Sequence, residues 1–186
     1  MKVNFNRLFW GFILIFLEIH IFIDLLPDPV GYYLIFSGVN ATTKGNRNAD
    51  RIKILASILI IVSIPTVVVQ QTVGMNAVGH IEAISLWFIY TTILAIVKLI
   101  LVFFVFQFIM EIVMTLSDEA LIKRSSQAFK VYMVLMLIIT FSHSFVMNIW
   151  SDLVAAYLLF TIPISIGLEI MFLVLLRKLH KHEALQ

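Results

Sequence analysis

The sequence predicts an all-α integral membrane protein, a single-domain bundle of six transmembrane helices with both termini in the cytoplasm. Of the 186 residues, 61% are hydrophobic and 13% are charged, against about 25% charged residues in an ordinary soluble domain. The hydrophobic residues form six apolar segments, and nearly all lysines and arginines fall in alternate connections between them. A chain this apolar has too little polar surface to cover itself in water, so its expected solvent is the lipid bilayer.

The six predicted spans cover residues 8–26, 30–43, 52–69, 83–114, 128–149 and 153–176. A helix that rises 1.5 Å per residue needs about 20 residues to cross the ~30 Å hydrocarbon layer. The second segment is shorter than that, so its length alone allows either a short tilted span or a re-entrant segment. Pro65 and Pro163 lie within the third and sixth segments and are expected to kink them.

The first segment begins like a signal peptide, because Lys2 and Arg7 precede an apolar run. The run continues past Glu18 and His20 to Leu26 without a small-residue cleavage site. We therefore predict an uncleaved first span.

The distribution of positive charge decides how the second segment lies. Of the 13 lysines and arginines, 12 fall in four regions, residues 2–7, 44–53, 123–130 and 177–181. The three intervening connections contain none. Because basic loops stay in the cytoplasm, all four regions can be cytoplasmic only if the second segment crosses the membrane. A re-entrant second segment would place four basic residues outside, so six spans are favoured.

The second span has a clear start and one small-residue face. Asp28 and Pro29 are typical of a helix start, since a carboxylate can cap the first turn and proline lacks an N–H that needs a partner there. Gly31 and Gly38 are seven residues apart and share one helix face. That face is expected to pack closely against another helix.

The fourth segment continues to Leu116, so one helix from Ala83 would be about 51 Å long. Ser117 is followed by two acidic residues, Asp118 and Glu119. A hydroxyl cap followed by acids is typical of a new helix start, so Ser117 is expected to cap the next helix.

The resulting hairpin, residues 115–127, is expected to project into the cytoplasm by about two to three helical turns. Its tip mixes apolar and basic residues, namely Leu121, Ile122, Lys123 and Arg124. The tip is either an ordinary solvated helix end or a docking surface for a membrane or cytoplasmic protein partner.

Ionisable groups within a span are costly, so each is a functional candidate. Counted at 1.5 Å per residue, Lys98 and Glu169 lie about 22 and 24 Å below the outer surface. They therefore share a level and can form a buried ion pair between the fourth and sixth spans. Alternatively, Lys98 extends its flexible side chain to the inner headgroups.

A second polar group lies near the outer surface and comprises Glu18, His20, Asp24 and His143. Carboxylates and imidazoles facing an outer cavity can bind a divalent metal, relay protons or hold a cationic solute. The alternative is that acidic residues simply collect in short outer loops. No His-x-x-x-His or Glu-x-x-His pair fixes two ligands on one helix face, so we assign no metal site and no cofactor.

Catalytic motifs are not evident. The chain has no cysteine and no glycine-rich phosphate loop. Ser142, His143 and Ser144 are sequence neighbours, which on a helix point about 100° apart. Nothing beyond ordinary juxtamembrane charge favours nucleic-acid binding.

The segment from Asp24 to Tyr32 reads DLLPDPVGY and follows Ile23. It resembles an IDLLPD…GY signature of small uncharacterised multi-pass membrane proteins of Gram-positive bacteria. The resemblance covers one hairpin and implies a bacterial plasma-membrane protein without supplying an activity. Length and span number are also similar to those of the substrate-binding subunits of energy-coupling-factor vitamin transporters, but their Ala-x-x-x-Ala pattern is missing from the first span.

Three functional hypotheses follow. The first, which the sequence favours, is a non-enzymatic accessory or scaffold subunit that works through its helix faces and its cytoplasmic hairpin. The second is a transporter or solute-binding subunit that uses the outer pocket and the Lys98–Glu169 pair. The third is a metal-dependent intramembrane enzyme.

Overall fold

The structure, a computed structural model, describes residues 3–17, 28–40, 45–66, 81–116, 118–146 and 151–183. These residues form six α-helices: α1 (Phe5–Leu17), α2 (Asp28–Asn40), α3 (Arg47–Val62), α5 (Ile81–Leu116), α6 (Glu119–His143) and α7 (Ser151–Glu183). The predicted all-α fold is confirmed for this part of the chain.

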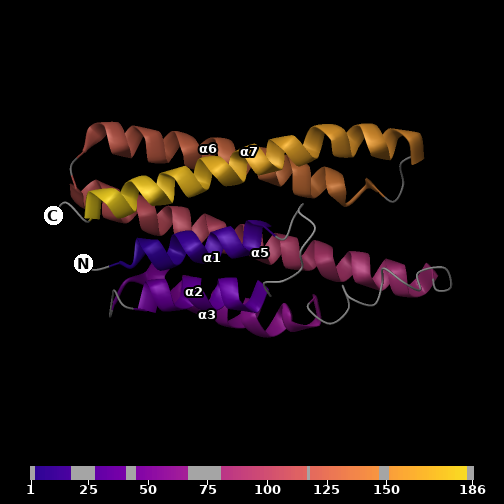
Figure 1. Ribbon diagram of the computed structural model, residues 1–186, viewed down its shortest axis with the longest axis horizontal. Coiled ribbons are helices and arrows are strands. Elements are labelled where there is room, and N and C mark those ends of the chain that lie inside the picture. Colours follow the sequence, from indigo (N-terminus) through magenta and orange to yellow (C-terminus); the bar gives the residue numbers. More distant parts are fainter. Residues whose placement is uncertain are drawn as a thin grey trace.

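The helices are arranged as an up-and-down ring. Each described helix packs against the next one along the chain, and α7 packs against α1. Figure 1 shows the helices running along the long axis in alternating directions, with the start of α1 and the end of α7 at the same end. An even number of antiparallel helices brings the two ends of the chain together in this way.

Three of the described helices are long and apolar enough to cross a membrane, and they indicate a membrane location. They include Leu86–Thr115 of α5, Glu119–His143 of α6 and Leu153–Lys181 of α7. Helices α1, α2 and α3 have 13, 13 and 16 residues, which correspond to about 20–24 Å. They are shorter than the bilayer core, and parts of the first three predicted spans (residues 18–26, 41–43 and 67–69) lie outside the described residues.

Two helix starts are fixed by side-chain caps. The Asp118 carboxylate accepts a hydrogen bond from the Leu121 N–H at 3.0 Å, and the Asn46 side chain accepts one from the Ala49 N–H at 2.9 Å. The cap of α6 is therefore Asp118 and not Ser117 as predicted, since a carboxylate one residue later reaches the free N–H groups of the first turn. Helix α2 begins at Asp28, as the sequence predicts.

Pro65 interrupts the third predicted span instead of kinking it. Helix α3 ends at Val62, and the backbone N–H of Ser63 donates to the Leu59 carbonyl at 2.9 Å. A separate helical turn, residues 64–66, follows. Proline has no N–H to continue the ladder and disfavours helix just before it. Pro163, by contrast, lies inside the continuous helix α7.

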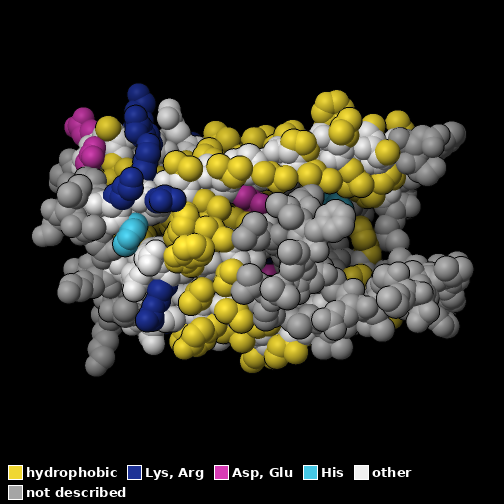
Figure 2. Space-filling model, in the orientation of Figure 1, with side chains coloured by type: hydrophobic (Ala, Val, Ile, Leu, Met, Phe, Trp, Pro, Cys, Tyr) yellow, Lys and Arg dark blue, Asp and Glu magenta, His cyan; other side chains and the backbone are white. Residues whose placement is uncertain are grey.

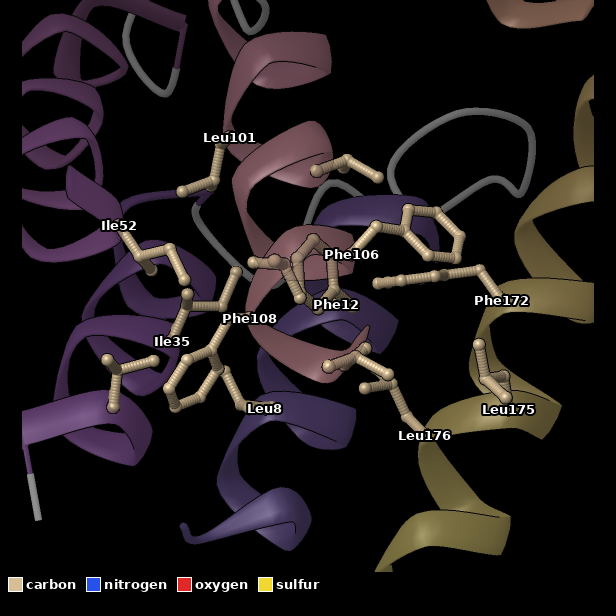
Figure 3. Close-up of a cluster of buried hydrophobic side chains, with 14 of the residues drawn as sticks. Leu8, Phe12, Ile35, Ile52, Leu101, Phe106, Phe108, Phe172, Leu175 and Leu176 are labelled. Carbon is tan, nitrogen blue, oxygen red and sulfur yellow. The ribbon is translucent and has the colours of Figure 1, made fainter. Parts of the chain in front are cut away.

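Aromatic side chains fill the centre of the ring. The Phe172 ring of α7 lies 4.8 Å from Phe12 of α1 and 4.8 Å from Phe106 of α5, measured between ring centroids. Figure 3 shows these rings meeting between the three helices, with leucines and isoleucines around them. Tilted and edge-on ring pairs of this kind add to the stabilisation from packing.

Helices α1 and α2 approach each other through glycines. A Cβ atom added at Gly31 would lie 2.8 Å from the Gly11 carbonyl oxygen and 2.6 Å from the Ile15 side chain. One added at Gly38 would lie 3.2 Å from the Asn4 carbonyl oxygen. The predicted close packing of the Gly31–Gly38 face is confirmed, and its partner is α1.

Candidate functional site: a buried carboxyl between α5, α6 and α7

Glu169 is the most deeply buried acidic side chain of the described helices, with 4% of its surface exposed. It lies near the middle of α7, three residues before the central Phe172. Tyr132 of α6, 1% exposed, contacts the same Phe172 ring at 5.8 Å between ring centroids. Lys98 of α5 lies over the Phe16 ring, which in turn lies 6.2 Å from Phe172. Three helices long enough to span a membrane therefore each bring one ionisable residue to the same interior region.

Lys98 does not form the predicted contact ion pair. Within the described ranges no ammonium-to-carboxylate distance of 4.0 Å or less joins it to Glu169. Its Nζ instead donates a hydrogen bond to the Ile15 carbonyl at 3.3 Å and lies 5.2 Å from the Phe16 ring centroid. A carbonyl in the last described turn of α1 and the face of an aromatic ring both attract a cation. The ammonium is thus held by α1 inside the bundle.

Glu169 consequently has no strong direct partner. No hydrogen bond or contact ion pair joins its carboxyl group to another described residue. A charged carboxylate without such partners is costly to keep in an apolar interior. The group must therefore be neutralised by a proton, by a bound cation or by movement of Lys98.

The predicted outer pocket is described only at His143. Its other members, Glu18, His20 and Asp24, lie outside the described residues. The His143 ring stacks on Phe88 of α5 at 5.7 Å and lies 6.5 Å from the Tyr157 ring of α7. The described residues contain no group of three or more histidine or acidic side chains placed to hold a metal ion.

The predicted docking hairpin is exposed only in part. Leu121 is buried and Ile122 is half-buried, and both pack against the hydrophobic core, whereas Lys123 and Arg124 are exposed. The docking surface stays a prediction, and its two basic residues are the accessible ones. The first turn of α6 lies on the rest of the bundle, and its apolar side chains turn inward to meet it.

No protein-family model, curated protein or solved structure matches this chain. The chemistry of the region is that of one carboxyl and one ammonium group inside an apolar helical bundle.

A polar contact at the basic end was not predicted. Glu111 of α5 accepts hydrogen bonds from the side-chain amides of Asn46 and Asn48, at 2.7 and 2.6 Å. Arg51 of α3 lies 5.0 Å from the Phe104 ring centroid of α5 nearby. Glu111 falls within the predicted fourth span, so a full count of ionisable residues in that span would have found it. No pattern in the sequence predicts that Asn46 and Asn48 contact Glu111.

Replacing Glu111 with alanine is expected to loosen the α3–α5 contact. The variant loses two hydrogen bonds to a charged acceptor that is exposed to solvent, which together stabilise the fold by about 1 kcal/mol. Thermal unfolding in mild detergent should show a melting temperature lower by a few degrees. Glu111→Gln keeps one acceptor oxygen and should fall between the alanine variant and the wild type; an unchanged melting temperature in both variants would show that the contact contributes nothing.

Proposed function

We propose that this chain is a six-span protein of a bacterial plasma membrane, with its basic end in the cytoplasm. The up-and-down arrangement supports this topology, because an even number of crossings returns the chain to its starting side. Figure 2 shows the lysine and arginine side chains of the visible face gathered at one end, beside a broad hydrophobic band. Basic residues at one end of a membrane bundle are typical of its cytoplasmic side.

We further propose that the protein moves a proton or a small cation through the membrane, with Glu169 as the binding group. The observation that carries this proposal is a buried carboxyl with no hydrogen bond or contact ion pair to the described residues. Buried acidic groups of membrane proteins are commonly proton relays or cation ligands.

The ammonium group of Lys98 can take the place of the transported cation beside the Glu169 carboxylate. In the structure the ammonium is held by the Ile15 carbonyl, which leaves Glu169 free to accept a proton or cation. After that proton or cation leaves, Lys98 neutralises the carboxylate by turning toward it. Exchange between two positions of one long side chain avoids leaving a bare charge in the bundle.

An accessory role is the second candidate, and the surface of α6 favours it. Of the described side chains of this helix, only Leu121, Ser125 and Tyr132 are buried. A groove of about 470 Å³ separates its outer half from α5 and is lined mainly by isoleucine, leucine, phenylalanine and methionine. Such a surface suits lipid, or a transmembrane helix of a partner subunit.

Reconstitution in liposomes separates the two candidates. The purified chain is placed in vesicles that contain a pH-sensitive dye, and a potassium gradient with valinomycin makes the interior negative. Proton entry above that of empty vesicles, or sodium entry measured in parallel, is expected for a carrier. Vesicles that admit neither ion would contradict the transport proposal and favour the accessory role.

A further inference from the structure

A groove separate from the buried carboxyl lies between α6 and α7 at the basic end of the bundle. Its volume is about 270 Å³. Arg124 and Gln127 of α6 and Lys178 of α7 line it together with apolar side chains that include Val131, Met171 and Val174.

The groove is polar at one end and apolar at the other. Helices α6 and α7 are antiparallel neighbours, so Arg124 lies opposite Lys178, and Val131 lies opposite Met171. Arg124 and Val131 are seven positions apart along α6, and Lys178 and Met171 are seven positions apart along α7. Seven residues correspond to about 10 Å along a helix. Two cations therefore stand at the cytoplasmic mouth, and an apolar floor leads from them toward the centre of the bundle.

The two cations are not neutralised by the described residues. Arg124 and Lys178 are exposed, and neither forms an ion pair with an acidic side chain of the described residues. Lys123 and Lys130 of α6 and Lys181 of α7 are also exposed and add further positive charge on these helices. The mouth of the groove is thus a positive region at the level where membrane headgroups lie.

We propose that this groove binds one anionic phospholipid of the cytoplasmic leaflet. The phosphate lies between Arg124 and Lys178, with Gln127 as an additional donor, and an acyl chain follows Val131, Met171 and Val174. Basic pockets between membrane helices on the cytoplasmic side are suited to anionic headgroups. The inference does not depend on the transport proposal, but it rests on the proposed topology, in which the basic end faces the cytoplasm.

The combination of features favours a lipid over a soluble anion or an acidic peptide. A soluble anion would need only the cations and would gain nothing from the apolar floor. The floor continues from the headgroup level into the span, where Val131 and Val174 are 46% and 49% exposed. An acyl chain can enter from the surrounding bilayer without leaving lipid, whereas an acidic peptide would have to bury its backbone there.

The test is lipid binding by the purified full chain in mild detergent, followed by native mass spectrometry. Dioleoylphosphatidylglycerol and dioleoylphosphatidylcholine are added in equal amounts. The wild type should retain the anionic lipid with a preference of roughly tenfold or more. Arg124→Gln combined with Lys178→Gln should reduce that preference to near unity.

Two matched variants keep the test specific. Lys123→Gln combined with Lys130→Gln removes the same amount of charge from α6, but neither residue lines the groove. This variant should keep most of the preference. Val131→Trp keeps every charge but fills the floor, and should lower retention of the anionic lipid severalfold. A melting curve for each variant verifies folding.

Three results would overturn the proposal. The first is a wild type without preference for the anionic lipid. The second is an equal loss in both double variants, which would show that overall surface charge is responsible. The third is undiminished binding by Val131→Trp, which would show that the cations act without the groove.

Discussion

Replacing Glu169 with glutamine is expected to reduce ion entry into liposomes to the level of empty vesicles, a loss of more than tenfold. Glutamine has nearly the same shape as glutamate but cannot take up a proton and carries no charge to bind a cation. The surrounding packing, including the Phe172 and Tyr132 rings, should be retained. Dye fluorescence in the valinomycin assay measures the loss, and the melting temperature verifies that the variant is folded.

Glu111→Gln is the matched control, since it makes the same chemical change on α5 at an exposed carboxylate. Its ion entry should remain within about twofold of the wild type, because a mild loss of stability does not alter the interior. Ion entry that persists in Glu169→Gln would contradict a binding role for this carboxyl. Equal losses in the two variants would indicate a defect in folding or reconstitution.

Replacing Gly31 with alanine is expected to cause a large loss of stability for the addition of a single methyl group. The new Cβ would lie 2.6 Å from the Ile15 side chain and 2.8 Å from the backbone carbonyl oxygen of Gly11. The Ile15 side chain can move, but the carbonyl belongs to the backbone, so α1 and α2 must separate. Overpacking of this kind costs about 1–3 kcal/mol, and the melting temperature in mild detergent should fall by about 5 °C.

Gly167 supplies a control on the same principle. It lies within helix α7, and a Cβ added there meets no atom within 4 Å. Gly167→Ala should leave the melting temperature unchanged or raise it slightly, because alanine favours helix over glycine by about 1 kcal/mol. If Gly31→Ala and Gly167→Ala behave alike, the close approach of α1 and α2 is not what holds these helices together.

Several features could be predicted from the sequence because they depend on neighbouring residues or on helix periodicity. Apolar runs gave the positions of the long helices, and the acidic residues after Leu116 located the break between α5 and α6. The seven-residue spacing of Gly31 and Gly38 predicted a close-packed face. Burial of Glu169 inside the bundle followed from the cost of exposing a charge to lipid.

Other features depend on which helices are neighbours, and no local pattern encodes that. Depth along the helices placed Lys98 level with Glu169, but the carbonyl of Ile15 on α1 takes the ammonium. The sequence leaves Leu121 accessible to a partner, whereas in the structure α6 packs so that this side chain is buried. The bonds from Asn46 and Asn48 to Glu111 join residues more than 60 positions apart.

The six-span topology can be tested directly because the natural chain has no cysteine. Single cysteines are introduced at Asp50, whose side chain is 57% exposed at the start of α3, and at Asn76 in the predicted outer connection. A membrane-impermeant maleimide is applied to intact cells and then to permeabilised cells. Six spans predict that Asn76→Cys is labelled in intact cells, and that Asp50→Cys is labelled only after permeabilisation. If α5, α6 and α7 alone cross the membrane with a cytoplasmic C-terminus, both cysteines lie outside, and labelling of both in intact cells would contradict the six-span account.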